Sequence, residues 1–203
     1  SILKPRYSRY VIDLNRSPDD VSLYPGQNTT GLCPLKAFTG EAIYLDGQEP
    51  DHNEIVHRRT QYWQPYHSAL HAELVRIKQQ HGKVLLWEGH SIQPELPFLF
   101  EGKLPDLNLG TANGASFPNE FLNTFTDILS QQSLYTWVSN GRFKGGYITR
   151  HYAEPDARIY AFQLELSQSA YMDHNFKHFD DKKAAPVQLI IENMMHTAMA
   201  LMG

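Results

Sequence analysis

The sequence has little cysteine, no long apolar run and no strongly basic segment. Cys33 is the only cysteine among 203 residues, which excludes an intrachain disulfide and indicates a reducing compartment, the cytoplasm. No stretch approaches the roughly 20 consecutive apolar residues that span a bilayer. The net charge is -4, and no basic run is interleaved with aromatic residues, which argues against a nucleic-acid partner. We therefore predict a cytoplasmic protein that binds neither membranes nor nucleic acid.

The residues that are present predict one α/β domain. An apolar share of 41% suffices for a sizeable core, and no internal repeat divides the chain, so a single domain over residues 1–203 is expected. Helical spacing at residues 53–80 is followed by the apolar run 83–88, which is typical of a helix that leads into a strand buried on both faces. Gly82 is predicted to end the helix, and Pro65 to kink or split it.

Periodicity predicts the other regular elements. Alternation with period two predicts strands at residues 9–14, 145–152 and 158–166, with Asp156 in the turn between the last two, and amphipathic spacing predicts helices at 118–132 and 187–201. These elements again indicate an α/β fold.

Two segments rich in glycine and proline, residues 15–50 and 91–117, are predicted to be irregular. Loops of this length in compact domains are usually functional or disordered. Aromatic residues in the first segment, Tyr24 and Phe38 among them, favour an ordered loop that packs on the body of the domain.

His90 is a candidate metal ligand. It follows Gly89 at the end of the predicted buried strand, and ligands of open α/β sheets gather beyond the carboxyl ends of strands. A neutral imidazole is also a common zinc ligand. An equally good interpretation is a histidine that hydrogen-bonds a loop carbonyl, because one histidine does not make a metal site.

Glu165 is a candidate general base. It lies near the end of the last predicted strand between Leu164 and Leu166, and it faces away from the core if those two leucines face it. Partial desolvation at such a position would raise its pKa toward a value that suits proton transfer. The alternative is a structural carboxylate paired with an arginine.

Polar and basic residues at two places could bind a carboxylate. Asn15 and Arg16 follow the first predicted strand, and an arginine fork suits bidentate binding of a carboxylate. Arg142, Lys144 and Arg150 lie around three glycines, which let the backbone approach a ligand closely. The ordinary alternative for this second group is a hairpin with a solvated positive face.

Three other signals carry less weight. Ser91 lacks the Gly-x-Ser-x-Gly elbow of a serine hydrolase, and Cys33 has no reactive signature, so it is interpreted as a packed thiol. His67 and His71 have the spacing of metal ligands on a helix, but Ser68 replaces the glutamate of the zincin pattern. We interpret both histidines as helix-surface or packing residues.

Longer motifs resemble the N-formylglutamate amidohydrolase (deformylase) family. They occupy residues 6–16, 23–27, 30–34, 62–67, 88–92, 99–102, 104–111 and 140–152. They span nearly the whole chain in the family's order, and motifs this long rarely recur by chance. The chain is identified as a member of that family on these motifs.

The resemblance implies a fold similar to zinc-dependent exopeptidases of the carboxypeptidase and aspartoacylase kind, with a mixed β-sheet sandwiched between helices. It implies hydrolysis of N-formyl-L-glutamate to formate and L-glutamate in histidine degradation. The implied cofactor is Zn²⁺ or another divalent metal, and the implied partner is an acidic small molecule.

The resemblance also implies roles for individual residues. By position, His90 resembles the family's metal-binding histidine, and Glu165 resembles its general base. Asn15 and Arg16 resemble the pair that grips the substrate carboxylate in the wider superfamily. The basic glycine-rich motif implies that at least one of Arg142, Lys144 and Arg150 binds the second substrate carboxylate.

Two departures from the family pattern qualify these expectations. The family usually has Asp where this chain has Glu88, and its members begin with a segment that holds a Ser-Pro-His-Ser-Gly motif and further metal ligands. Nothing before Arg6 matches that segment, so an N-terminally truncated fold is expected. A noncatalytic or fragmentary relative that binds an acidic amino-acid derivative, and an amidohydrolase for another N-acyl amino acid, stay open as alternatives. The oligomeric state stays open too.

Overall fold

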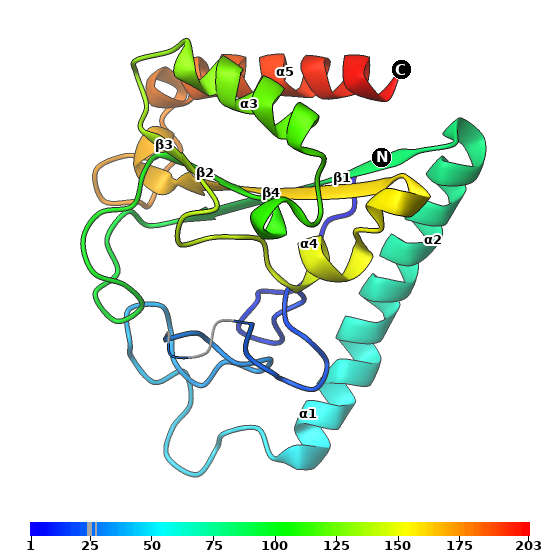
Figure 1. Cartoon of the computed structure of the whole chain (residues 1–203). Coiled ribbons are helices and arrows are strands. Elements are labelled where there is room, and N and C mark those ends of the chain that lie inside the picture. The colour runs from blue at the N-terminus through cyan, green and yellow to red at the C-terminus, as the bar shows by residue number, and fades with distance from the viewer. Residues whose placement is uncertain (24–25, 27) are drawn as a thin grey trace. The chain divides into compact units, whose positions relative to one another are not determined.

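The computed structural model describes residues 1–23, 26 and 28–203, and the chain forms two compact units (Figure 1). Unit 1 comprises Ser1–Ile77 and Leu96–Gly102, and unit 2 comprises Lys78–Glu95 and Lys103–Gly203. The expected single domain over residues 1–203 stays a prediction. Tyr24 lies outside the described residues, and so does the expectation that it packs on the body of the domain.

Unit 2 contains one mixed four-stranded β-sheet with the strand order β1-β4-β2-β3. Its strands are β1 (Val84–Ile92), β2 (Leu107–Gly110), β3 (Trp137–Ser139) and β4 (Ile159–Ser167). β1 runs parallel to β4 and β2 runs parallel to β3, whereas β2 and β4 are antiparallel. The predicted mixed α/β architecture is therefore confirmed, and β4 lies inside the sheet with a neighbour on each side.

Helices cover both faces of this sheet. The helices of unit 2 are α3 (Asn119–Ser130), α4 (Tyr147–Tyr152) and α5 (Asp181–Met202), with short 3₁₀ turns at Ala112–Gly114, Pro155–Ala157 and Gln168–Ala170. α3 and α5 lie on one side of the sheet and α4 on the other (Figure 1). Among the described residues, no helix combines the length and apolar character needed to cross a bilayer.

The core of unit 2 lies between the sheet and helices α3 and α5. Phe162 of β4 is fully buried there, and its ring centroid lies 4.6 Å from that of Trp87, 5.0 Å from Phe125 and 5.1 Å from Phe117. Met194 of α5 is fully buried in the same cluster. Apolar alternation in β4 therefore gives one face of the sheet to the core.

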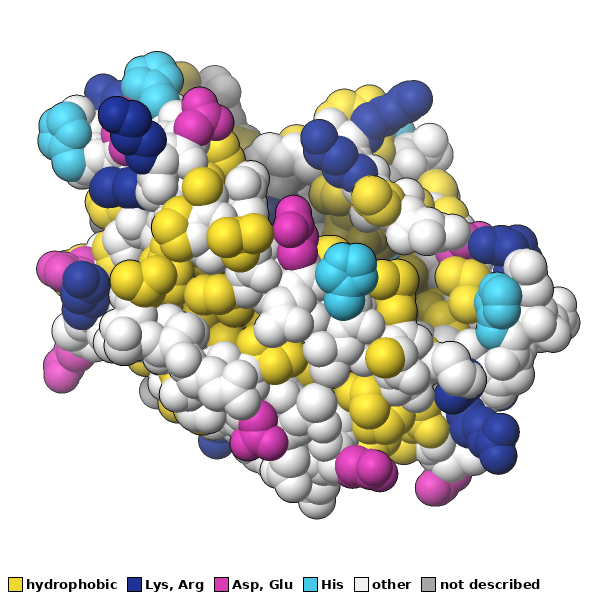
Figure 2. Space-filling view, turned by 90° about the horizontal axis from the view of Figure 1, so that it is seen from above, with side chains coloured by type: hydrophobic (Ala, Val, Ile, Leu, Met, Phe, Trp, Pro, Cys, Tyr) yellow, Lys and Arg dark blue, Asp and Glu magenta, His cyan; other side chains and the backbone are white. Residues whose placement is uncertain are grey.

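The outer face of α5 is partly apolar. Leu189, Met195 and Met199 are exposed on it. Figure 2 looks onto the face that carries α3 and α5 and shows apolar side chains among the charged ones. The inward residues of α5 thus supply the core contacts, and the outward apolar residues do not.

Unit 1 combines one long helical stretch with irregular chain. The stretch consists of α1 (His52–Arg58), a π-helical turn (Arg59–Trp63) and α2 (Gln64–His81), of which the part from Lys78 on belongs to unit 2. Pro65 has no N–H to donate, and the N–H of Gln64 reaches back five residues to the carbonyl of Arg59. The α-helical pattern is therefore interrupted by a wide turn just before the proline, and α2 continues through Pro65 without a break. Within residues 15–50, those that the structure describes are irregular as predicted, apart from a β-bridge between Lys36 and Ala42.

Two of the predicted strands are wrong. Residues 9–14 form turns, in which the N–H of Val11 donates to Ser8 and that of Arg16 donates to Asp13. Residues 147–152 form α4, because Ile148, Thr149 and Tyr152 are buried at helical spacing against β1 and β4. Ile148 and Tyr152 are four residues apart, so they fit one face of a strand as well as one face of a helix. Packing on the sheet selects the helix.

Other predictions need smaller corrections. β1 is the edge strand of the described sheet. Several of its side chains are only half-buried, so the strand is not buried on both faces as predicted. It also extends further than predicted, through His90 to Ile92. The C-terminal helix begins at Asp181, before Pro186, because the Asp180 carboxylate caps it by accepting from the N–H groups of residues 182 and 183. Strand β2 lies inside a segment predicted to be irregular. Gly82 ends α2 with a φ of 75°, as expected.

Candidate functional site

The face of the sheet opposite the core of unit 2 is polar. On β4, Gln163 and Glu165 alternate with Phe162 and Leu164, so their side chains point to this polar face. Gln163 is 4% exposed and Glu165 is 7% exposed, and the Nε2 of Gln163 donates to the Oε2 of Glu165 at 3.3 Å. The expectation that Glu165 faces away from the leucines beside it is confirmed.

A histidine and a second glutamate lie on the neighbouring strand. In the parallel pairing of β1 with β4, His90 is opposite Glu165 and Glu88 is opposite Gln163. The Nε2 of His90 lies 2.6 Å from the Oε1 of Glu88, and the Oγ1 of Thr149 in α4 donates to the other oxygen of Glu88 at 2.7 Å. Glu88 therefore holds His90 from one oxygen and is itself fixed from the other.

This arrangement suits proton transfer. It places a buried carboxylate, Glu165, next to a histidine that a second carboxylate orients. Such a group can take a proton from an attacking water and return it to a leaving amine. Sequence reasoning identified His90 and Glu165 but missed Thr149, which was assigned to a strand. Gln163 lies two residues before Glu165 in the same strand, so period-two alternation could have identified it as a residue of the same face.

The basic loop between β3 and α4 is organised by Asn140. The backbone of Asn140 has a φ of 51°, in the left-handed region that asparagine tolerates. Its Oδ1 accepts from the N–H of Thr111 at 2.9 Å and from that of Asn113 at 3.2 Å, and its Nδ2 donates to the hydroxyl of Thr111. One side chain therefore ties this loop to the segment that follows β2.

Strand β2 approaches the backbone of this loop closely at Gly110, whereas the expected close approach of a ligand to the glycines of the loop stays a prediction. A Cβ on Gly110 would lie 2.5 Å from the backbone nitrogen of Gly145, so no larger residue fits there. Arg142, Lys144 and Arg150 are half-buried, and the Nε of Arg150 donates to the carbonyl of Gly145 at 2.9 Å. The hairpin alternative is wrong, because the loop leads into α4.

In unit 1, Asn15 and Arg16 lie in a turn organised by Asp13. The buried carboxylate of Asp13 accepts from the N–H of Asn15 at 3.0 Å and from Arg9 at 2.6 Å. The Nε of Arg16 donates to the carbonyl of Thr30 at 2.8 Å and lies 3.7 Å from the Asp13 carboxylate. Backbone turns and side-chain bonds therefore fix this pair, and no strand carries it.

The residues given less weight also have defined places. Cys33 is buried, and burial raises the pKa of its thiol, which agrees with a packed and unreactive residue. His67 is buried and its ring stacks on Trp63 at 3.7 Å, which confirms the packing interpretation, whereas His71 is exposed. Ser91 accepts a hydrogen bond from the hydroxyl of Tyr171 at 2.6 Å.

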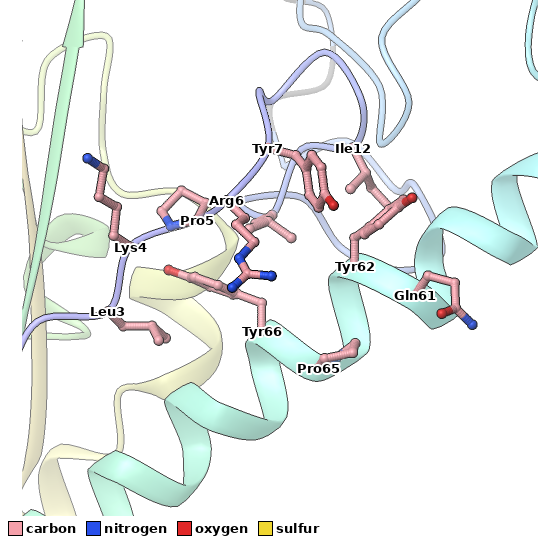
Figure 3. A pocket seen from close by; sticks show the side chains of 11 residues that line it. Leu3, Lys4, Pro5, Arg6, Tyr7, Ile12, Gln61, Tyr62, Pro65 and Tyr66 are labelled. Atoms are coloured by element: carbon pink, nitrogen blue, oxygen red, sulfur yellow. The ribbon is translucent and has the colours of Figure 1, made fainter.

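Unit 1 also contains a cavity of about 400 Å³ between residues 3–14 and the helical stretch. Figure 3 shows Tyr62 and Tyr66 on the helical side and Arg6 and Tyr7 on the other. The rings of Tyr7 and Tyr62 are 4.8 Å apart. Asn15 and Arg16 do not line this cavity, so it is separate from the candidate carboxylate-binding pair.

The residues described do not complete the expected zinc site. Within residues 1–23, 26 and 28–203, no three His, Cys, Asp or Glu side chains gather into a group that could hold a metal ion. A catalytic zinc normally has three protein ligands and an open position. His90 with Glu88 and Glu165 thus offers donors of a suitable kind without forming such a group.

Comparisons with known proteins support the resemblance found in the sequence. The family model described as N-formylglutamate amidohydrolase matches residues 1–172. An N-formylglutamate deformylase of Pseudomonas putida is 45% identical over 202 residues, 98% of this chain and 75% of that protein. An N-formylglutamate deformylase of Pseudomonas aeruginosa is 46% identical over 173 residues, 85% of this chain and 65% of that protein. The chain thus spans about two thirds to three quarters of these relatives.

Solved structures share the fold. The crystal structure of N-formylglutamate amidohydrolase from Ralstonia eutropha JMP134 matches with a TM-score of 0.69 at 21% identity and covers 96% of this chain and 72% of that chain. A gene product of Agrobacterium tumefaciens matches with a TM-score of 0.66 at 18% identity, over 98% of this chain and 70% of that one. At these identities the likeness concerns the fold alone.

Proposed function

Because this chain belongs to the N-formylglutamate amidohydrolase family, we propose that it hydrolyses the formyl amide of N-formyl-L-glutamate to formate and L-glutamate, as a step of histidine degradation. The observation that carries the proposal is the 45% identity over 98% of the chain to an N-formylglutamate deformylase. In this reaction water adds across the C–N bond of the formyl amide. The hydroxyl goes to the formyl carbon and a proton goes to the leaving amine.

Glu165 is the general base in this proposal. Its carboxylate would take a proton from the attacking water and pass it to the amine as the C–N bond breaks. Burial on the polar face of the sheet, beside Gln163, supports this role because it keeps bulk water from competing for the carboxylate. His90 lies opposite on β1 and is oriented by Glu88.

The substrate carries two carboxylates, and basic residues of this chain suit them. We assign one carboxylate to Asn15 and Arg16 and the other to at least one of Arg142, Lys144 and Arg150. Guanidinium groups bind carboxylates in bidentate geometry, which explains a preference for an acidic amino acid. Variants of each group test its role separately.

Two finer expectations stay predictions. The first is a fold of the zinc-dependent exopeptidase kind. The second is a cofactor, Zn²⁺ or another divalent metal, which would polarise the formyl oxygen when bound. His90 is a candidate ligand for it, but the described residues form no complete site, so no step above depends on the metal.

The test is formate release from N-formyl-L-glutamate, with metal content measured by elemental analysis on the same samples. Glu165→Gln should lower kcat by roughly 10²- to 10⁴-fold, the usual contribution of a general base. The matched control is Glu192→Gln on the exposed face of α5, which should keep the wild-type rate. Circular dichroism of both variants checks that the fold is retained.

Other outcomes would point to the alternatives. Binding of N-formyl-L-glutamate in calorimetry without formate release would favour a noncatalytic relative. Release of acetate from N-acetylglutamate without formate from the formyl compound would favour another N-acyl substrate. Wild-type activity in Glu165→Gln would remove the role assigned to that residue.

A further inference from the structure

Four side chains from the helical stretch of unit 1 donate hydrogen bonds to one short segment, residues 11–18. The contacts are Arg58 Nη1 to the carbonyl of Val11 at 3.0 Å, Arg59 Nη1 to that of Pro18 at 3.1 Å, Trp63 Nε1 to that of Arg16 at 3.0 Å, and His67 Nε2 to that of Leu14 at 2.9 Å. We call these four residues the donor row. The irregular segment that they hold contains the proposed carboxylate-binding pair.

The donor row has a simple structural origin. Arg59, Trp63 and His67 are four residues apart, so they lie on one side of the helical stretch. The π-helical turn widens the helix at this point and brings Arg58 to the same segment. Each donor satisfies a backbone carbonyl that no β-ladder satisfies, because residues 11–18 form no strand.

Two members of the donor row form hydrogen bonds on both sides of the pair Asn15 and Arg16. The carbonyl of Leu14 belongs to the peptide bond that precedes Asn15, and the carbonyl of Arg16 belongs to the peptide bond that follows Arg16. The donors, Trp63 and His67, stack on one another and are 8% and 5% exposed. Each donor therefore contacts a peptide bond that directly flanks the pair.

The bond from His67 also defines its tautomer. A carbonyl oxygen can only accept, so the Nε2 of His67 must carry the proton in this contact. Glutamine has an N–H donor of similar reach, whereas leucine has similar bulk and no donor. This difference allows the hydrogen bond to be tested apart from the packing.

We propose that His67 and Trp63 are positioning residues, which set Asn15 and Arg16 in the geometry that binds a substrate carboxylate. The inference rests on the proposed function, because it takes the carboxylate-binding role of that pair from it. Neither residue needs to touch the substrate. Their effect is on substrate affinity, and it is transmitted through two backbone carbonyls.

The experiment compares formate-release kinetics of the wild type with His67→Leu, His67→Gln and His71→Leu. His67→Leu should raise KM for N-formyl-L-glutamate roughly tenfold with kcat changed less than about twofold, since a lost positioning contact weakens ground-state and transition-state binding together. His67→Gln should restore most of the affinity. His71→Leu removes an exposed histidine one helical turn further on and should match the wild type.

Trp63→Phe provides a second variant. It keeps an aromatic ring against His67 but loses the Nε1–H donor to Arg16, so KM should rise again while kcat is retained. If both Trp63→Phe and His67→Leu kept the wild-type KM, the positioning role would be wrong.

Hydrogen exchange separates a failure of this inference from a failure of the proposed function. Amide exchange over residues 13–17 should become faster in His67→Leu and stay unchanged in His71→Leu, whatever the substrate of the protein. Faster exchange with no formate release from the wild type would overturn the proposed function but keep the anchoring of the segment. Unchanged exchange and unchanged KM in His67→Leu would overturn the inference while leaving the deformylase activity intact.

Discussion

The backbones of the two units of this protein are held in place by different kinds of contact. In unit 2, backbone ladders of a four-stranded sheet and an aromatic core around Phe162 hold the chain. In unit 1, the donor row holds the irregular segment 11–18 through side chains that donate to backbone carbonyls. A ladder depends little on which residues form it, but a side-chain donor depends entirely on its residue type.

The comparison predicts different sensitivities to substitution. Unit 2 should suffer most from a loss of apolar volume, because its core is densely packed. Unit 1 should suffer most from a loss of single polar donors, because each removal leaves a backbone carbonyl without its partner. The substitutions below test this contrast, and the largest expected effect comes first.

Phe162→Ala should cause the largest loss of stability. The fully buried ring contacts Trp87, Phe117 and Phe125, and such truncations typically cost about 3–5 kcal/mol. The free energy of unfolding from urea titration measures the effect. The control is Leu189→Ala on the exposed face of α5, which should stay within about 0.5 kcal/mol of the wild type. Equal losses in both variants would contradict the picture of one dominant core.

Arg58→Met should have an intermediate effect confined to unit 1. The guanidinium donates to the carbonyl of Val11, to the hydroxyl of Tyr44 and to Glu54. Burial lowers the pKa of Arg58, but its bonds to Tyr44 and Glu54 outweigh this and raise it, so the group stays charged. Loss of the charged donor should cost about 1–3 kcal/mol.

Alkylation of Cys33 by iodoacetamide reports the effect of Arg58→Met locally, because this thiol is buried in unit 1. Labelling should become faster in Arg58→Met. Arg76→Met is the matched control, because Arg76 pairs with Glu73 on the surface, and such pairs contribute little. An unchanged labelling rate in Arg58→Met would show that unit 1 does not depend on this donor.

The smallest expected effect concerns the pH dependence of stability. Burial raises the pKa of Cys33 in the folded state above its ordinary value of 9.0. The unfolded chain therefore releases the thiol proton first, and stability falls as pH rises from about 9 through the folded pKa. Urea titrations at pH 8 and pH 10 should show this loss in the wild type relative to Cys33→Ala. A difference between the two proteins that does not change with pH would contradict it.

Much of unit 2 could be predicted from the sequence because its elements are periodic. Apolar alternation predicted β4, and amphipathic spacing predicted α3 and most of α5. The strand predicted at residues 145–152 failed because period two and helical spacing share positions over such a short segment, and contact with the sheet decides between them. The placement of His90 beside Glu165 depends on the register of β1 with β4, which no local pattern contains.

Unit 1 was harder to predict from the sequence for a physical reason. Its order comes from contacts such as that of His67 with Leu14, which are 53 residues apart in the chain. A histidine on a helix carries no local sign of the carbonyl that it will bind. The irregular character of the segment was predicted from its glycines and prolines, but the side chains that hold it were not.

The π-helical turn in unit 1 bears on how this chain tolerates insertions and deletions. The wide turn takes up one residue more than an α-turn, so a deletion inside Arg59–Trp63 would restore an α-turn and leave the faces of α1 and α2 nearly in phase. An α-helix turns by about 100° per residue, so the same deletion within α2 before His67 would instead rotate Arg58 away from the carbonyl that it binds, relative to His67. A gap at the π-helical turn in an alignment of homologous chains is therefore compatible with a retained carboxylate-binding turn, whereas a gap early in α2 is not.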